Sequence, residues 1–259
     1  MTFFRFSQLP DFLIIGAQKA GTTTLYHYLS QHPKVFMPAI KEVHFFDLNY
    51  ENGLKWYKEF FRSKGLFGGT IAGEASPYYL FHPLVPQRVA HHLPKIKLIV
   101  LLRNPVDRAY SHFHHERMHK TEIIENFEKA IEKENERITE NEEYLISGRI
   151  KQSDAHQSFS YISRGLYARQ INRWLKHFPL SQMMFIKSED FFKNPENELH
   201  AVYRFLGIKE VFPGLLTPKN ANFYPGLTLE TRIKVSLLFD QDARELRKLI
   251  GEKFRWDLT

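Results

Sequence analysis

The chain has 259 residues, of which 43% are hydrophobic and 15% aromatic, and it contains no cysteine. This content is enough for a packed core and excludes a disordered protein, while the missing cysteine excludes disulfide frameworks, thiolate zinc sites and cysteine nucleophiles. The formal net charge is +7, but residues 121–143 carry −6, so the remainder carries +13, which suits an anionic ligand.

Targeting signals are not evident in the sequence. The N-terminus lacks the basic region and long apolar core of a signal peptide, and no apolar run reaches the roughly 18 residues that span a bilayer. We therefore expect a soluble, cytoplasmic protein without stable membrane insertion. No repeat or low-complexity linker interrupts the chain, so we expect a single domain over residues 1–259.

Strands and helices are predicted to alternate along the chain. Apolar runs predict buried strands at residues 11–16, 69–76, 96–103 and 182–191. Helical patterns occur at residues 22–30, 86–93, 105–119, 121–147, 166–178, 195–206 and 228–250. This order predicts an α/β, P-loop-like three-layer fold with a central, mostly parallel sheet flanked by helices. In such folds ligands bind beyond the carboxyl ends of the strands.

The first predicted strand runs into a glycine-flanked loop and then a helix. Gly16 and Gly21 have Walker A spacing, but Thr22 stands where the lysine should be, and Lys19 lies three residues upstream. Backbone N–H groups and the helix dipole make this an anion site, and Thr22 to Thr24 add hydroxyl donors. The alternative is a tight turn with capping threonines. Without Gly-Lys-Thr or a clear metal-binding acid, kinase or ATPase chemistry is disfavoured.

A second anion site is predicted after the strand at 96–103. Asn104 is a good N-cap and Pro105 suits the first helical position, so a helix begins at once. Arg103 at the strand end and Ser111 on that helix could hold one anion between them. The alternative is a surface arginine and an ordinary helix serine.

Three segments together resemble a known family. They are residues 18–33 (QKAGTTTLYHYLSQHP), 41–47 (KEVHFFD) and 101–113 (LLRNPVDRAYSHF). In this order they resemble sulfotransferases that use 3′-phosphoadenosine 5′-phosphosulfate (PAPS), most closely the heparan sulfate N- and 3-O-sulfotransferase branch. The resemblance extends over nearly the whole chain, including residues 73–80, 164–179 and 204–208.

The resemblance implies a cofactor site that needs no metal. Residues implied to hold the 5′-phosphosulfate are Lys19, Ala20, Gly21, Thr22, Thr23 and Thr24, while Arg103 and Ser111 would hold the 3′-phosphate. Lys219, Asn220 and Tyr224 fall in a C-terminal nucleotide loop. Lys19 would stand beside the bridging oxygen, where negative charge develops as the sulfuryl group leaves 3′,5′-adenosine bisphosphate (PAP).

The acceptor side is implied by the KEVHFFD segment. The family pattern gives the role of base to Glu42, with His44 helping or orienting the acceptor and Asp47 orienting its neighbours. Without the resemblance, Glu42 would be a surface charge and His44 a packing residue. His115 is expected to face the acceptor, because the helix that carries Ser111 would point it into the cleft.

The acceptor itself is not specified by the sequence. Ala75 replaces a lysine that is frequent in related glycan sulfotransferases, and Asn220, Ala221 and Asn222 stand where basic and glycine residues are usual. This loss of charge disfavours a highly anionic polysaccharide. It favours a lipid, polyketide-like or neutral sugar hydroxyl, with an amine less favoured.

Other interpretations remain open at this stage. His115, Glu116 and His119 match the H-E-x-x-H pattern of a zinc hydrolase, although no third ligand stands out. A sulfotransferase fold that only binds nucleotide is a further alternative. Basic residues form no continuous stripe, so we expect no nucleic-acid partner, and the oligomeric state is not predicted. The acidic segment 115–160 is either a substrate-gating lid or a solvated helix.

Overall fold

The computed structural model describes residues 9–65, 71–211, 217 and 224–257. A five-stranded sheet lies at its centre, in the order β2-β3-β1-β4-β5, and all its strand pairs are parallel. The strands are β1 (Phe12–Gly16), β2 (Val35–Phe36), β3 (Ile71–Ala75), β4 (Lys97–Leu102) and β5 (Met183–Lys187). The predicted parallel α/β sheet is confirmed, and the two-residue β2 was not predicted.

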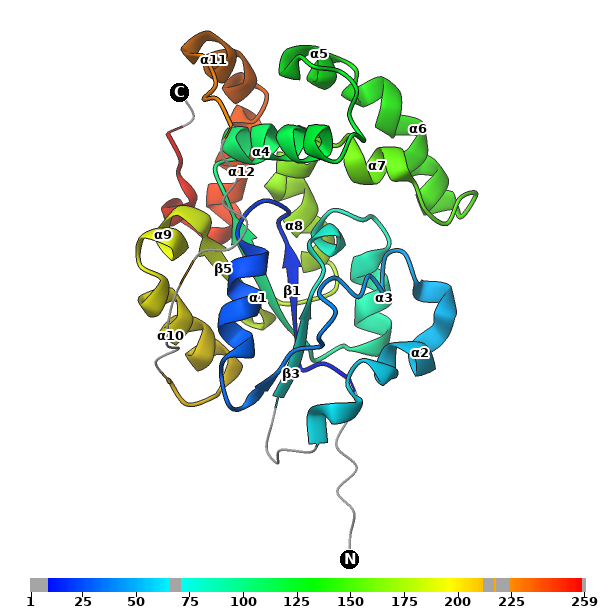
Figure 1. Ribbon diagram of the computed structural model, residues 1–259, viewed down its shortest axis with the longest axis vertical. Helices are drawn as coiled ribbons and strands as arrows, with labels where there is room; N and C mark the ends of the chain where they lie inside the picture. The colour runs from blue at the N-terminus through cyan, green and yellow to red at the C-terminus, as the bar shows by residue number, and fades with distance from the viewer. Residues whose placement is uncertain (1–8, 66–70, 212–216, 218–223, 258–259) are drawn as a thin grey trace, which may run out of the picture.

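Helices surround this sheet (Figure 1). They are α1 (Thr22–Ser30), α2 (Gly53–Glu59), α3 (Val85–His92), α4 (Pro105–Met118), α5 (Phe127–Glu132), α6 (Glu134–Ser147), α7 (Asp154–Ser158), α8 (Tyr167–Leu175), α9 (Ser188–Lys193), α10 (Pro195–Leu206), α11 (Leu229–Leu237) and α12 (Asp240–Ile250). Figure 1 shows α1 and α10 on one side of the sheet and α2 and α3 on the other. Helices α4 to α7 lie beyond the carboxyl end of β1. None of the helices within the described ranges has the length and apolar character needed to cross a membrane.

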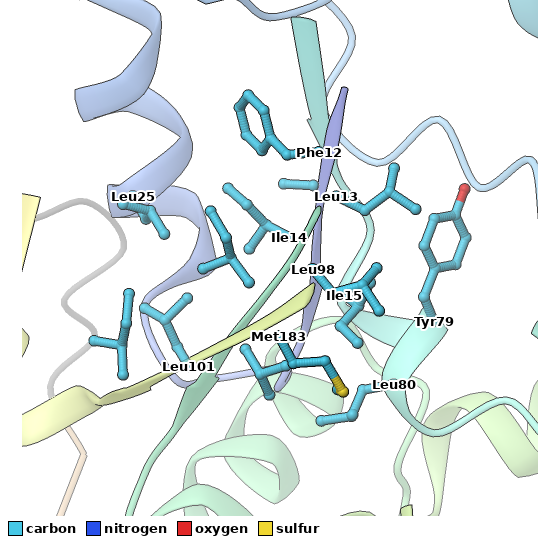
Figure 2. Packing of buried hydrophobic residues seen from close by; sticks show 14 of the residues in the cluster. Phe12, Leu13, Ile14, Ile15, Leu25, Tyr79, Leu80, Leu98, Leu101 and Met183 are labelled. Atoms are coloured by element: carbon cyan, nitrogen blue, oxygen red, sulfur yellow. The ribbon is translucent and has the colours of Figure 1, made fainter. Parts of the chain in front are cut away.

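The core forms on both faces of β1, because every residue of that strand is buried. Side chains alternate across a strand, and Figure 2 shows Phe12 and Ile14 on the side of Leu25 while Ile15 points toward the side of Tyr79. Gly73 on β3 lies opposite Phe12, and a Cβ there would come within 2.2 Å of the Phe12 ring. Only glycine allows this close packing of the two strands.

Three predicted elements were too long. The helix predicted at 121–147 begins only at Phe127, because Asn126 caps it by accepting from the Lys129 amide at 2.9 Å. It is also divided at Lys133 into α5 and α6. The helix predicted at 228–250 is divided into α11 and α12. The strand predicted at 182–191 ends at Lys187, and α9 follows directly.

Candidate active site

The loop after β1 forms a cradle at the carboxyl edge of the sheet. Gly21 precedes α1 with φ of 101°, a conformation that favours glycine, and a Cβ there would meet the Phe192 ring at 2.9 Å. Leu25 makes the first helical bond to the Gly21 carbonyl, so the amides of the first turn of α1 are directed at the loop. Thr22 and Thr24 are buried and Thr23 is half-buried. The Ala20 carbonyl accepts from Ser188 at 2.9 Å.

Lys19 is half-buried within this loop and has φ of 69°. Its carbonyl accepts from the Arg103 guanidinium at 3.2 Å, so the end of β4 is tied to the loop after β1. Burial lowers the pKa of the Lys19 ammonium, and the charge of Arg103 lowers it further, whereas Glu116 and Glu42 oppose this. The bond from Arg103 thus brings together two of the residues that the sequence assigned to the donor site.

Helix α4, which carries part of the second predicted anion site, begins where the sequence predicts. The Asn104 side chain accepts from the Val106 amide at 3.0 Å and from the Asp107 amide at 3.4 Å, so the predicted N-cap of α4 is confirmed. Ser111 is buried two turns into this helix. Tyr224 also reaches α4, where its ring stacks on His114 with centroids 4.6 Å apart. Lys219 and Asn220 lie outside the described residues.

The KEVHFFD segment lies against the end of β3. The Glu42 amide donates to the Ala75 carbonyl at 3.1 Å. His44 contacts two carboxylates, with Nε2 3.3 Å from Glu42 Oε2 and Nδ1 2.8 Å from Asp47 Oδ2. Asp47 is buried, and Lys41 forms an ion pair with the other oxygen of Glu42. The structure therefore brings Glu42, His44 and Asp47 together in one chain of contacts.

These contacts set the charge states of Glu42 and His44. Burial alone would raise the pKa of Glu42, but the hydrogen bond to His44 and the charge of Lys41 lower it to about 2. Burial alone would lower the pKa of His44, but its bonds to Asp47 and Glu42 raise it to about 10. At neutral pH Glu42 is thus a weakly basic carboxylate, and His44 is an imidazolium.

His115 lies close enough to Lys19 and Glu42 for both charges to act on it. Burial and the charge of Lys19 lower the pKa of His115 to about 4, so the ring is neutral at pH 7. The zinc-hydrolase interpretation gains no support here. The Glu116 carboxylate lies 3.3 Å from His112 Nε2, and within the described ranges no three His, Cys, Asp or Glu side chains are grouped to hold a metal.

Sequence reasoning gave no role to Arg164, which is 1% exposed. Its guanidinium donates to Gln18 Oε1 in the loop after β1 at 2.6 Å and lies over the Tyr78 ring, 4.9 Å from its centroid. It therefore contacts the loop at Gln18, next to Lys19, whose carbonyl accepts from Arg103. The resemblance could have indicated a role for Arg164, because this arginine is the first residue of segment 164–179, which carries part of that resemblance.

The acidic segment 115–160 is anchored through buried polar groups. Glu134 is 2% exposed and accepts from the amides of Ile162 and Ser163, both at 2.7 Å. The segment returns to α4 at Tyr161, whose carbonyl accepts from the buried Arg108 guanidinium. These contacts attach the segment to α4, and the choice between a gating lid and a solvated helix stays open.

Comparison with known proteins agrees with this arrangement. The model of the sulfotransferase domain family matches residues 9–218. The chain is 28% identical to the membrane-associated sulfotransferase kil1 of Dictyostelium discoideum, over 96% of this chain and 66% of that protein. It is 35% identical to human heparan sulfate glucosamine 3-O-sulfotransferase 3B1, over 79% of this chain and 47% of that protein.

A solved sulfotransferase structure has a similar fold. The sulfotransferase from Alicyclobacillus acidocaldarius is 30% identical, has a TM-score of 0.77, and is matched over 96% of this chain and 99% of its own. This likeness confirms the predicted fold, and the human relative confirms the resemblance to heparan sulfate sulfotransferases. The chain spans less than two thirds of the length of the two curated relatives. Since the family model covers most of the sequence, the chain belongs to the sulfotransferase domain family.

Proposed function

We propose that this chain transfers the sulfuryl group of PAPS to an acceptor hydroxyl by in-line displacement. The observation that carries this proposal is that the Lys19 loop follows β1 while the Glu42 amide bonds to Ala75 at the end of the neighbouring strand β3. A cation for the leaving group and a carboxylate for the incoming hydroxyl are the two groups that the reaction needs.

The residues of the cradle suit the donor. The amides at the start of α1 and the Lys19 ammonium belong to one loop, which suits a 5′-phosphosulfate. Arg103 and Ser111 would hold the 3′-phosphate, with Tyr224 nearby, stacked on His114 of α4. In the proposed roles, the acceptor oxygen bonds to sulfur as the bond from sulfur to the bridging oxygen breaks. The electron pair stays on that oxygen, which Lys19 stabilises, and PAP is the product.

The acceptor proton passes to Glu42 in this scheme. With Lys41 and His44 on its two oxygens, Glu42 is held as a carboxylate but is only weakly basic. An acceptor that displaces Lys41 would raise the pKa of Glu42 and make it a better base. His44 is already protonated at neutral pH, which favours Glu42 over His44 as the proton acceptor.

A hydroxyl is the proposed acceptor, on a neutral sugar, lipid or polyketide-like molecule. The human relative is named for 3-O-sulfation, which supports a hydroxyl over an amine. Ala75, in the place of a lysine frequent in related enzymes, supports an acceptor of low negative charge. A protein that binds nucleotide without transfer is disfavoured, because Lys19, Glu42, Arg103 and Ser111 are all present.

Calorimetric titration of the metal-free protein with PAP, ATP and AMP tests the donor site. Micromolar binding of PAP with much weaker binding of ATP and AMP is expected, because only PAP carries phosphate at both predicted anion sites. An acceptor screen with PAPS would follow. A preference for ATP with Mg²⁺, or no nucleotide binding at all, would overturn the proposal.

A further inference from the structure

One carboxyl group, that of Glu74, is buried directly behind the KEVHFFD segment. Glu74 lies on β3 and is 1% exposed. Its Oε1 accepts from the Tyr57 hydroxyl at 2.6 Å and from the Tyr79 hydroxyl at 2.9 Å, and its Oε2 accepts from Ser76 Oγ at 3.1 Å. Three hydroxyl donors on one buried carboxylate form a polar network inside an otherwise apolar core.

Two of these hydroxyls also hold the segment that carries the proposed base. Ser76 Oγ accepts from the His44 amide at 3.2 Å. The Tyr79 hydroxyl accepts from the amides of Phe45 and Phe46 at 2.8 and 3.2 Å. A hydroxyl has one hydrogen, and when this is donated to a carboxylate its lone pairs are left for the amides. The carboxylate therefore fixes the direction of every hydrogen bond in the network.

The held segment has an unfavourable backbone. Glu42 has φ of 64° and His44 has φ of 53°, both in the left-handed region that residues other than glycine rarely adopt. Such conformations persist only where surrounding contacts impose them. Here the contacts are the bonds from three consecutive amides to Ser76 and Tyr79, together with the bond from the Glu42 amide to the Ala75 carbonyl.

We propose that Glu74 is a positioning residue for sulfuryl transfer, acting through Ser76 and Tyr79 to hold Glu42 and His44 in place. The inference rests on the proposed function for its catalytic consequence, but the positioning itself can be measured without an acceptor. His44 reports on it, because its contacts with Glu42 and Asp47 exist only while the segment keeps this backbone.

The test compares wild type with Ser76→Ala, Tyr79→Phe and Glu74→Gln. Burial raises the pKa of Glu74 to about 7, so transfer assays at about pH 8 keep it ionised in the wild type. Tyr203→Phe is the matched control for Tyr79→Phe. Tyr203 is equally buried, but its hydroxyl has no hydrogen-bond partner in the part of the chain that the structure describes.

The first measurement is the titration of His44 by NMR, with the signal assigned through His44→Asn. In the wild type the pKa of His44 is about 10. We expect it to fall by at least about one unit in Ser76→Ala and Glu74→Gln, which is a tenfold change in proton affinity. The second measurement is kcat, expected to fall about five- to tenfold for each lost hydrogen bond, with PAP affinity within about twofold of wild type.

The outcomes separate this inference from the proposed function. Folded Ser76→Ala and Tyr79→Phe variants with an unchanged His44 titration and unchanged kcat would overturn the positioning role. If Glu74→Gln fails to fold, the result for Ser76→Ala decides whether the network positions the segment. This variant leaves the carboxylate and both tyrosines in place. A wild type that binds no PAP but whose His44 responds to Ser76→Ala would refute the proposed function alone.

Discussion

Lys19→Met removes the charge of a half-buried side chain while keeping much of its length and bulk. A unit charge about 4 Å from the developing negative charge contributes about 4 kcal/mol at an effective dielectric constant near 20. Removal of one preorganised donor to such a charge typically costs about 3–4 kcal/mol. Both figures predict that kcat falls by about 10²- to 10³-fold. The loss should appear in kcat more than in nucleotide affinity, because the charge on the bridging oxygen grows only as the bond breaks.

The assay follows PAP released from PAPS with the best acceptor of the screen, and calorimetry with PAP measures binding separately. Lys55→Met is the control, since Lys55 is an exposed lysine of α2. A second readout needs no acceptor: loss of the Lys19 charge should raise the pKa of His115 from about 4. If kcat stays within about tenfold of wild type while PAP binding weakens, Lys19 contributes only ground-state binding and the assigned role is wrong.

Three further predictions concern the other site residues. Arg103→Ala should weaken PAP binding by roughly 10- to 150-fold, the equivalent of one charge-assisted contact of about 1.5–3 kcal/mol, and calorimetry should show a much smaller effect on AMP. Glu42→Gln should lower kcat by about 10²- to 10⁴-fold with PAP affinity retained, and full activity would transfer the role of base to His44. The pKa of His44 is raised from 6.5 to about 10, so its stabilising contribution is complete below pH 6.5 and is lost as pH rises toward 10. The difference in Tm between wild type and His44→Asn should therefore be largest near pH 6, and a difference independent of pH would contradict the ion-pair geometry.

Much of the fold could be predicted because local signals decided it. The helix at Thr22–Ser30 was predicted at its observed bounds, since glycine before it and Gln31 to Pro33 after it leave little choice. Asn104 and Pro105 likewise fixed the start of α4. The start of α5 at Phe127 and its division from α6 at Lys133 were missed, because the acidic pattern runs on without a break through both positions.

The candidate site was predictable only where residues lie in recognisable motifs. Lys19, Glu42 and Arg103 were named from their segments, although their convergence depends on the order of β1, β3 and β4 in the sheet. Glu74 was given no role although Ser76 and Tyr79 are near it in sequence, because nothing in the sequence indicates that its carboxylate is buried. Arg164 was given no role because it contacts Gln18, which lies 146 positions away. Long-range polar contacts of this kind leave no periodic signal in a single sequence.

The chain returns to α4 at Tyr161, and this contact affects how the length of the segment between them can vary. Helices α5 to α7 form a closed excursion, because the chain leaves α4 after Met118 and is bound back to it through Arg108. Loop-closure entropy grows only slowly with loop length, so such an excursion tolerates large changes in size. The length of this excursion can therefore differ between related proteins without a change in β1 or in the Lys19 loop.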